Sequence, residues 1–264
     1  MDKFHYTLVW LLPFLSVVTA AVEHTDEEAR VVNGKDAELG QFPYQALLII
    51  HLAGGKGALC GGSLLSDEWV LTAGHCVQDA TSFDVTLGAI ELKNNTNDGG
   101  RVTLSSSEFI QHENYQAGSA ANDVAVIKLP SKVTFNDRIQ PIKLPTGRDS
   151  YAQQQVLVSG FGQQHDNGAV AQKLQYAPLT VIRNTECMLV YGVVAIKTNN
   201  ICARGVNRES ACHGDSGGPL VLEQDHTLVG VVSFGTLLGC ERGLPVVYAR
   251  VTEFRDWIKE KTGI

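Results

Sequence analysis

The stretch Ala211-Cys212-His213-Gly214-Asp215-Ser216-Gly217-Gly218-Pro219 decides how this sequence is interpreted. A serine among glycines, with a cysteine on one side and a proline on the other, indicates a hydroxyl displayed on a tight turn. Glycine permits backbone angles closed to other residues and lets a ligand approach the main chain. Peptide N–H groups around such a turn could face the negative charge that develops in acyl transfer. A plain surface turn would fit the same pattern, so the rest of the chain must decide.

Most of the chain consists of short apolar segments separated by turn residues. Many are rich in Val, Ile and Thr and are bounded by Gly, Asn, Asp or Pro, which is typical of an all-β sandwich or pair of barrels. The strands are expected at 44–52, 63–65, 69–72, 83–87, 101–104, 124–129, 155–159, 174–182, 220–222, 227–233 and 246–251. The chain ends in a helical pattern, in which Val251, Phe254, Trp257 and Ile258 share one face and Gly263 follows as a terminator.

The serine turn is also consistent with a second fold, because Gly214-x-Ser216-x-Gly218 fits the nucleophile elbow of α/β-hydrolases. In that fold the catalytic residues follow the order Ser, then Asp or Glu, then His. The only histidine after Ser216 is His226, ten residues on, in a stretch that we expect to be a hairpin turn. The sequence also lacks an alternation of strands with long helices. Both observations count against the α/β-hydrolase fold.

Upstream of the serine, a histidine and a carboxylate occupy suggestive positions. The segment Trp69–Cys76 places His75 at a strand end beside a cysteine, and Asn122–Leu129 places Asp123 at the head of an apolar strand. A buried carboxylate there needs a partner. Taken singly, His75 could be a polar strand end and Asp123 a turn residue. Their joint occurrence in the order His, Asp, Ser predicts nucleophilic catalysis by Ser216.

The first thirty residues look like processing segments. Residues 1–20 have a charged start, an apolar centre and a small-residue end, which predicts a secretory signal peptide cleaved after Ala20. The alternative, a membrane anchor, is disfavoured because the apolar run is short and Pro13 interrupts it. Residues 21–30 are acidic and end in Arg30, which indicates either a proteolytic processing point or a plain linker.

Cysteines and charge limit the remaining possibilities. In an oxidising compartment the six cysteines can form three disulfides, for which the sequence alone permits about fifteen pairings. Their spacing is not that of a zinc site, so we expect neither a metal nor another cofactor. The formal net charge is −7, which gives no electrostatic reason to expect nucleic acid.

At these motifs the chain resembles the chymotrypsin-type serine endopeptidases, from Val31 to about Ile264. In detail it is similar to the secreted chymotrypsin-like and brachyurin-type collagenolytic enzymes of arthropods. The matching motifs are Val31-Val32-Asn33-Gly34, Cys60-Gly61-Gly62-Ser63-Leu64, Leu71-Thr72-Ala73-Gly74-His75-Cys76, Asn122-Asp123-Val124-Ala125-Val126-Ile127-Lys128-Leu129, Gly214-Asp215-Ser216-Gly217-Gly218-Pro219-Leu220 and Val247-Tyr248-Ala249-Arg250-Val251.

The resemblance implies a fold and a catalytic set. Two antiparallel β-barrels, at about 31–138 and 139–250, would hold the active site in the cleft between them and be followed by a C-terminal helix at about 251–262. Ser216 would be the nucleophile, His75 the general base and then acid, and Asp123 the group that orients the imidazole. The N–H groups of Gly214 and Ser216 would form the oxyanion hole.

The resemblance also implies a disulfide pattern and an activation step. The pairs would be Cys60–Cys76, Cys187–Cys202 and Cys212–Cys240. Cleavage after Arg30 would free the amine of Val31, which would insert beside Asp215. The chain departs from the family at Asn33, where glycine is commoner, and at Gly74, where alanine is usual.

Specificity follows from the primary pocket. The resemblance implies, by position, that Ser210 forms the pocket base, Gly235 its mouth and Val246 its wall, with Ser233 in the same pocket. A substrate Arg or Lys would lack a counter-charge at Ser210, so we expect cleavage after Phe, Tyr, Leu or Met. Elastase-like or broad collagenolytic specificity is the alternative. Another, trypsin-like protease would then have to cut after Arg30.

Several smaller expectations remain. Asn94 begins a glycosylation sequon, and the loop 88–100 lacks the carboxylate pair of a calcium loop. His213 could line the cleft and make substrate binding pH-sensitive, or it could be a solvated loop residue. The implied partners are protein or peptide substrates, an activating protease and protein inhibitors, acting on a secreted monomer that binds neither nucleic acid nor membrane. A catalytically silent homologue that acts as a binding protein is the competing class.

Overall fold

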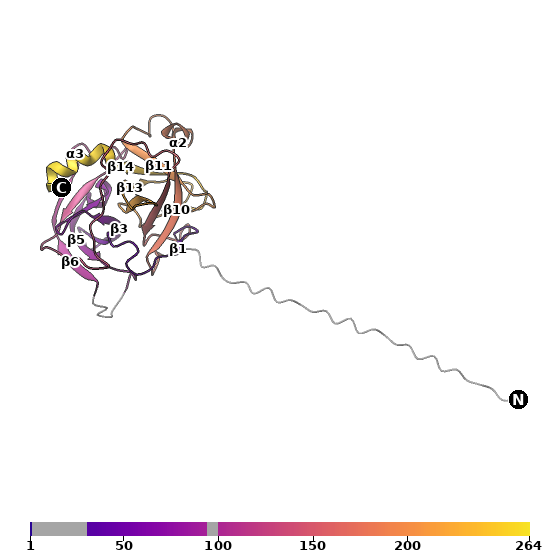
Figure 1. The fold of residues 1–264 in the computed structure, drawn as a ribbon, viewed down its shortest axis with the longest axis horizontal. Coiled ribbons are helices and arrows are strands. Elements are labelled where there is room, and N and C mark those ends of the chain that lie inside the picture. Colours follow the sequence, from indigo (N-terminus) through magenta and orange to yellow (C-terminus); the bar gives the residue numbers. More distant parts are fainter. Residues whose placement is uncertain (2–30, 94–99) are drawn as a thin grey trace.

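The computed structural model describes Met1, residues 31–93 and residues 100–264. Two antiparallel sheets and a C-terminal helix make up this part of the chain (Figure 1). The prediction of an all-β fold with two barrels is confirmed. The predicted signal peptide beyond Met1, the predicted propeptide and the sequon at Asn94 lie outside the described residues and stay predictions.

The first sheet comes from the first half of the chain and is curled around its own core. Its strands lie in the order β6-β5-β2-β3-β4-β8-β7. Their bounds are β2 Gln45–Leu52, β3 Gly57–Leu64, β4 Trp69–Thr72, β5 Ala80–Leu87, β6 Val102–Ser106, β7 Glu108–Gln111 and β8 Ala125–Lys128. In the described chain no strand pairing joins β6 to β7, so this barrel is open along one edge. Leu48, Leu71, Phe83 and Ile127 are fully buried inside it.

The second sheet closes into a barrel. Its order is β1-β10-β11-β14-β13-β12-β9, and β10 also pairs with β9. The bounds are β1 Lys35–Asp36, β9 Gln155–Gly160, β10 Gln175–Ile182, β11 Asn200–Arg204, β12 Pro219–Leu222, β13 Leu228–Phe234 and β14 Val246–Arg250. Val31, Val158, Leu220 and Tyr248 belong to its separate core. The turn expected at His226 joins β12 to β13.

Three helices complete the fold: α1 Gly74–Val77, α2 Asn184–Tyr191 and α3 Val251–Thr262. The predicted apolar face of α3 is buried, and Gly263 ends the helix in the left-handed conformation with φ 79°. Helix α2 was not expected from the sequence. Its Leu189 and Val190 are exposed, so the apolar residues do not follow the period of a helix packed on a core.

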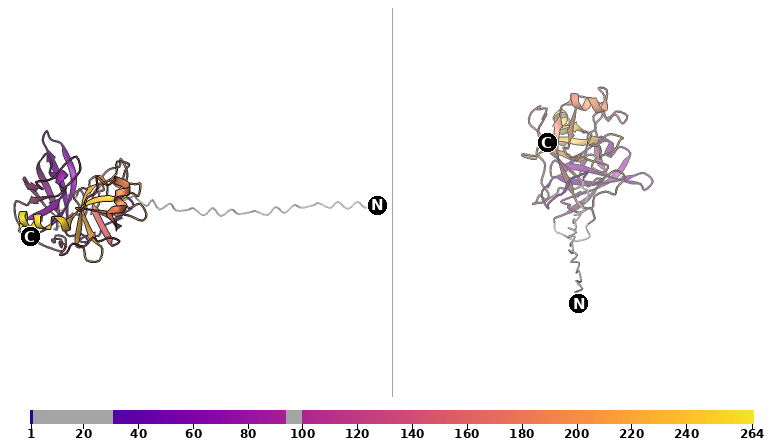
Figure 2. Two further views of the ribbon diagram at one scale, coloured as in Figure 1. Left: turned by 90° about the horizontal axis from the view of Figure 1, so that it is seen from above. Right: turned by 90° about the vertical axis from the view of Figure 1, so that its right-hand side faces the viewer.

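The two ends of the described chain cross over between the barrels. Strand β1 precedes the first sheet in sequence but pairs with β10 of the second. Helix α3 follows the second sheet but docks on the first, where Trp257 stacks on His112 at 5.1 Å between ring centroids. The Trp257 Nε1–H also donates to Glu113 Oε2 at 2.8 Å. Seen from above in Figure 2, α3 lies beside the lobe formed by the first half of the chain.

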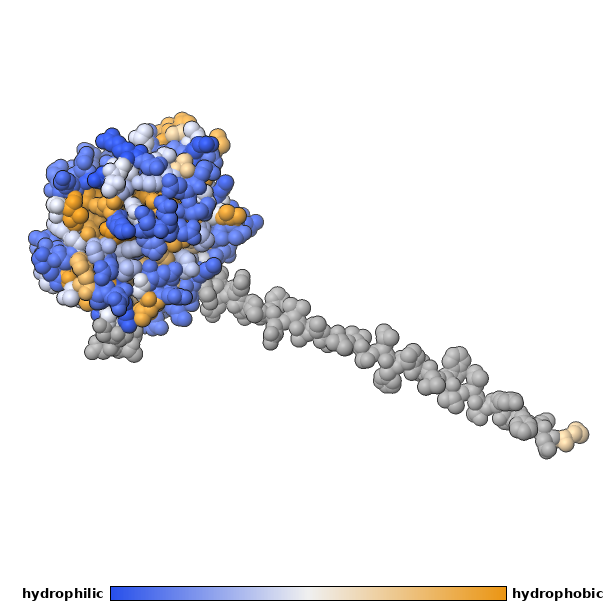
Figure 3. Space-filling model, in the orientation of Figure 1, coloured by the Kyte–Doolittle hydropathy of each residue, from blue (hydrophilic) through white to orange (hydrophobic). Residues whose placement is uncertain are grey.

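Most of the face seen in Figure 3 is hydrophilic, with apolar atoms gathered in a few places, one of them over α2. The exposed apolar residues of that region include Leu189, Val193 and Val194. Within residues 31–93 and 100–264, no helix has the length and apolar character needed to cross a membrane.

Candidate active site

The carboxylate of Asp123 organises the predicted catalytic residues. It lies just before β8 and is 1 % exposed. Its Oδ2 is 2.8 Å from His75 Nδ1, and its Oδ1 accepts the His75 backbone N–H at 2.8 Å. The Ser233 hydroxyl donates to the same Oδ2 at 2.6 Å. Three donors therefore satisfy this buried carboxylate and hold both the ring and the main chain of His75.

The imidazole of His75 stands at the start of α1, between this carboxylate and the Cys60–Cys76 disulfide. Its side chain is 31 % exposed, and its Nε2 lies 3.8 Å from Cys76 Sγ. Within the described chain no hydrogen bond joins Nε2 to the Ser216 hydroxyl. A hydrogen bond between a catalytic histidine and serine is often long without substrate and shortens in the substrate complex. The lack of this bond is therefore compatible with the predicted pairing of His75 with Ser216.

The serine turn is seated on the backbone of the first barrel. The Gly61 N–H donates to the Ser216 carbonyl at 2.7 Å. A Cβ added at Gly217, which has φ 78°, would lie 2.1 Å from Thr72 Oγ1, so only glycine fits here. Gly214 also needs its freedom, with φ 101°. The N–H groups of Gly214 and Ser216 donate to no group in the described residues, which leaves this pair available to a ligand.

The buried carboxylate of Asp215 holds the same turn through hydrogen bonds from backbone N–H groups. It is fully buried, and its two carboxylate oxygens accept the backbone N–H groups of Gly162 at 2.7 Å and Cys212 at 2.9 Å. Burial raises the pKa of Asp215 to about 6, while these two hydrogen bonds act in the opposite direction. Val31 is fully buried in the core of the second barrel. The next residue is held by a backbone hydrogen bond, in which the Ser210 N–H donates to the Val32 carbonyl at 3.3 Å.

Three disulfides are present, and they join the pairs that the resemblance implies. They are Cys60–Cys76, Cys187–Cys202 and Cys212–Cys240. The first anchors the segment that carries His75. The third ties the serine turn to the loop after β13.

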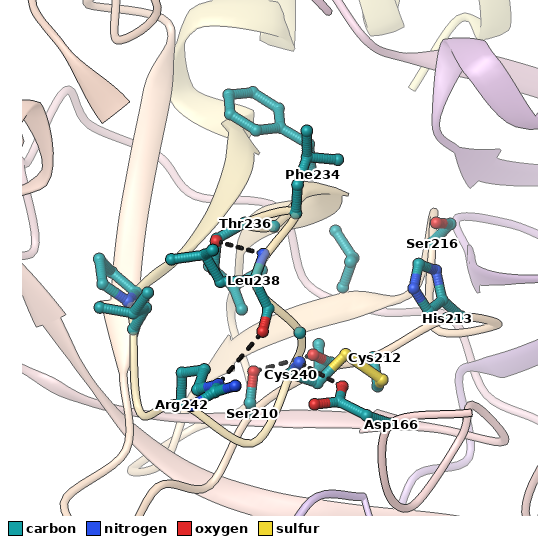
Figure 4. Close-up of a pocket in the computed structure, with 18 of the residues that line it drawn as sticks. Asp166, Ser210, Cys212, His213, Ser216, Phe234, Thr236, Leu238, Cys240 and Arg242 are labelled. Carbon is teal, nitrogen blue, oxygen red and sulfur yellow. Dashed lines mark hydrogen bonds between the residues drawn. A yellow bond between two sulfur atoms is a disulfide. The ribbon is translucent and has the colours of Figure 1, made fainter. Parts of the chain in front are cut away.

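A cavity of about 630 Å³ opens beside the serine. All four residues predicted for the substrate pocket line it: Ser210, Ser233, Gly235 and Val246. Ser210 is 2 % exposed, and its hydroxyl donates to the Ala211 carbonyl at 2.8 Å. His213 also lines the cavity, and Figure 4 shows it on the same side as Ser216.

Two charged residues of this cavity were missed in the sequence. Asp166 and Arg242 come from loops whose paths have no local sequence signal. Asp166 Oδ1 accepts the Cys240 N–H at 2.7 Å, and Arg242 Nε donates to the Leu238 carbonyl at 3.3 Å (Figure 4). The Asp166 carboxylate is therefore held against the backbone of the loop, and the cavity carries one charge of each sign.

Two barrels, the Asp123 carboxylate that holds His75, and the unbonded N–H pair around the half-buried Ser216 define a serine hydrolase of the two-barrel class. Comparison with known proteins agrees. The family model described as "Trypsin" matches residues 31–258. A collagenase of Hypoderma lineatum is 42% identical over 90% of this chain and 89% of its own length.

Two further relatives extend this comparison. Brachyurin of Leptuca pugilator is 38% identical over 89% of this chain and 99% of its own length. A solved structure of HL collagenase superposes with a TM-score of 0.80 at 41% identity, covering 88% of this chain and 98% of the other. The chain therefore belongs to the trypsin family and is a serine endopeptidase.

Proposed function

We propose that this serine endopeptidase is secreted as a zymogen, is activated by cleavage after Arg30 and prefers large apolar side chains before the scissile bond. The observation that carries the catalytic part is the carboxylate of Asp123. It holds both the ring and the main chain of His75 and receives a third hydrogen bond from Ser233.

In the proposed reaction the Ser216 hydroxyl oxygen attacks the scissile carbonyl carbon while His75 Nε2 accepts its proton. Asp123 stabilises the imidazolium that forms. The tetrahedral oxyanion would accept hydrogen bonds from the N–H groups of Gly214 and Ser216, each worth about 2.7–4 kcal/mol in such sites. Collapse expels the amine with the proton from His75 and leaves an acyl-enzyme, which water then hydrolyses by the same steps.

Covalent labelling tests this assignment. An activated sample should react with a fluorophosphonate at Ser216, and the Ser216→Ala variant should not. Absence of labelling in the folded wild-type protein would favour the competing class, a silent homologue that acts as a binding protein.

The activation step is supported by the environment of Asp215. A buried carboxylate without a cation favours the protonated form, which is the direction of its raised pKa. A new ammonium at Val31 would stabilise the charged form, provided that both groups are well hydrogen-bonded. Treatment of the precursor with trypsin should therefore create activity together with a new amino terminus at Val31. Full activity in a chain that cannot be cut after Arg30 would contradict the proposal.

The preferred substrate side chain is inferred from the pocket. Its base is the small, neutral Ser210, and Asp166 in its wall is already hydrogen-bonded to the Cys240 N–H. A substrate Arg would thus find no carboxylate at the pocket base. Val246 makes the lower pocket shallower, which favours Phe, Tyr, Leu or Met. Rates on matched peptides with Phe, Leu, Ala or Arg before the scissile bond test this, and fastest cleavage after Arg would contradict it.

A broader, collagenolytic specificity is the second candidate, because relatives at 42% and 38% identity are named collagenase and brachyurin. Cleavage of native triple-helical collagen below its melting temperature would support it. The remaining proposed partners are the activating protease and protein inhibitors, with the enzyme acting as a monomer.

A further inference from the structure

A second cavity, of about 540 Å³, lies on the second barrel and gathers three arginines. Arg204 ends β11, Arg208 lies in the following loop, and Arg242 comes from the loop after Cys240. The stem of Arg208 lies on the backbone of Gly243, where an added Cβ would be 3.1 Å from Arg208 Cγ. The two loops are thereby packed together, and the three arginines line one cavity.

Arg242 donates to the Leu238 carbonyl, but Arg204 and Arg208 lack the partners that other cations in the described part of the chain have. Lys128, Lys132, Lys173 and Lys261 each have a carboxylate oxygen within 3.9 Å. In residues 31–93 and 100–264, by contrast, the side chains of Arg204 and Arg208 make neither a hydrogen bond nor an ion pair. In a chain with a formal net charge of −7, unpaired arginines around one cavity indicate an anionic occupant.

One carboxylate does line this cavity, and it is already engaged. Glu186 Oε1 accepts the backbone N–H of Arg183 at 3.3 Å, as part of the capping box of α2. The nearby carboxylate of Glu209 is buried and accepts the backbone and side-chain N–H groups of Asn207. Neither is hydrogen-bonded to an arginine of the cavity.

The start of the described chain runs along the same loop. The Asn33 side-chain amide donates to the Asn207 carbonyl at 2.9 Å, and Asn207 is next to Arg208. The Ser210 N–H donates to the Val32 carbonyl at 3.3 Å. Val32 and Asn33 therefore lie beside the loop that carries Arg208.

The sequence immediately before Val31 is acidic, with Glu23, Asp26, Glu27 and Glu28. At about 3.3–3.6 Å per extended residue, positions 26–28 can reach about 10–18 Å from Val31. We propose that the cavity of Arg204, Arg208 and Arg242 is a binding site for peptide carboxylates and that its occupant is the acidic segment 23–28 of this chain. The occupant is the propeptide of the proposed zymogen, so the biological setting rests on that proposed function.

Docking of this segment would have a consequence for the adjacent Arg30–Val31 bond. While the chain is intact, the tether keeps the acidic segment at high effective concentration near the cavity and restrains the bond that the activating protease must bind. Cleavage removes the tether, so the short peptide dissociates. The arginines would thus slow cleavage after Arg30 without contacting the catalytic residues.

A double-mutant cycle tests the docking through the rate at which added trypsin cuts after Arg30. The reference is the inactive precursor with Ser216→Ala. One variant carries Arg204→Gln with Arg208→Gln, another carries Asp26→Asn, Glu27→Gln and Glu28→Gln, and a third combines both sets. At low salt the arginine variant should be cut about fivefold faster than the reference. The same arginine changes should have no effect once the acidic segment is neutral, nor should they at high salt.

The matched control is Arg148→Gln with Lys56→Gln, which removes two exposed charges that do not line the cavity. It should leave the rate unchanged. If the arginine variant is cut at the reference rate, or if its effect persists with a neutral segment, the proposal is overturned. Because Ser216→Ala is inactive and the protease is added, this result does not depend on the chain's own activity.

NMR of the arginine side chains in the same proteins detects the contact between the cavity and the acidic segment directly. The Nε–H signals of Arg204 and Arg208 should shift when the acidic segment is neutralised, and that of Arg148 should not. If these signals are the same in both proteins but move on addition of inorganic sulfate, the cavity takes an external anion and the proposed occupant is wrong.

Discussion

We expect a substitution at Gly235 to change substrate selection without disturbing the fold. It is exposed at the mouth of the candidate pocket, and a Cβ added there would meet no atom within 4 Å. We therefore expect Gly235→Val to fold with a melting temperature close to that of the wild type. The new side chain would occupy the space through which a large substrate side chain enters.

The size of the effect follows from the burial that such a substrate loses. Burial of a Phe or Leu side chain contributes about 1.5–3 kcal/mol, which corresponds to a factor of about 10 to 150 in rate. The kcat/KM of Gly235→Val for a Phe peptide should fall by this factor. For the matched Ala peptide, which does not reach into the pocket, it should change by less than about threefold.

The measurement is kcat/KM on the two peptides after trypsin activation, with active sites counted by fluorophosphonate. Gly147→Val is the control, because Gly147 also has no atom within 4 Å of an added Cβ and does not line the pocket. An equal fall on both peptides would mean that the change damages catalysis rather than selection. An unchanged rate on the Phe peptide would refute the assignment of this cavity to the substrate side chain.

Three further predictions concern the buried carboxylates of Asp123 and Asp215. Gly74→Ala adds a Cβ 3.0 Å from Tyr115 Cδ2 and 3.2 Å from Asp123 Oδ1, so kcat should fall several-fold and stability by about 1 kcal/mol, as measured by steady-state kinetics and urea unfolding. Ser233→Ala removes the 2.6 Å hydrogen bond to Asp123 and should lower kcat/KM about tenfold while most of the thermal stability remains; an unchanged kcat/KM would contradict this. Burial raises the pKa of Asp215 from 3.8 to about 6, so the folded state binds this proton more tightly than the unfolded state. That contribution, about 3 kcal/mol, is complete below pH 4 and is lost as the pH rises through 6. Urea unfolding of the uncleaved chain between pH 4 and 7 should show this pH dependence, and the Asp215→Asn variant should lack it; equal pH dependence of the two proteins would contradict the burial argument.

The sequence predicted best those features that are visible in a local hydrophobic period or in the order of residue types along the chain. Helix α3 has a complete apolar face, β6 alternates and β12 is wholly apolar, whereas β7 and β11 were not expected from the sequence. The order of His75, Asp123 and Ser216 was enough to choose between two folds for one serine turn. The all-β architecture of the model and the match of the trypsin family to residues 31–258 agree with that choice.

The remaining features depend on contacts between distant segments. Helix α2 exposes its apolar residues, and β1 is two residues long and defined by its pairing with β10. Asp166 and Arg242 reach the pocket through loops of irregular path. Ser233 was expected in the pocket, but its hydrogen bond to Asp123 joins the second barrel to the first. Such a bond follows from how the barrels pack, which no local pattern specifies.

The crossing of the chain ends has a consequence for how this molecule can be divided. Each barrel is completed by a piece from the other half of the sequence, because β1 pairs with β10 and Trp257 of α3 stacks on His112. A nick in the connection between β8 and β9 should therefore leave two fragments that stay bound to each other. Neither fragment contains everything that its own barrel uses. Loss of one barrel would expose the docking surface of the other, so heat or denaturant should dismantle both in a single cooperative step.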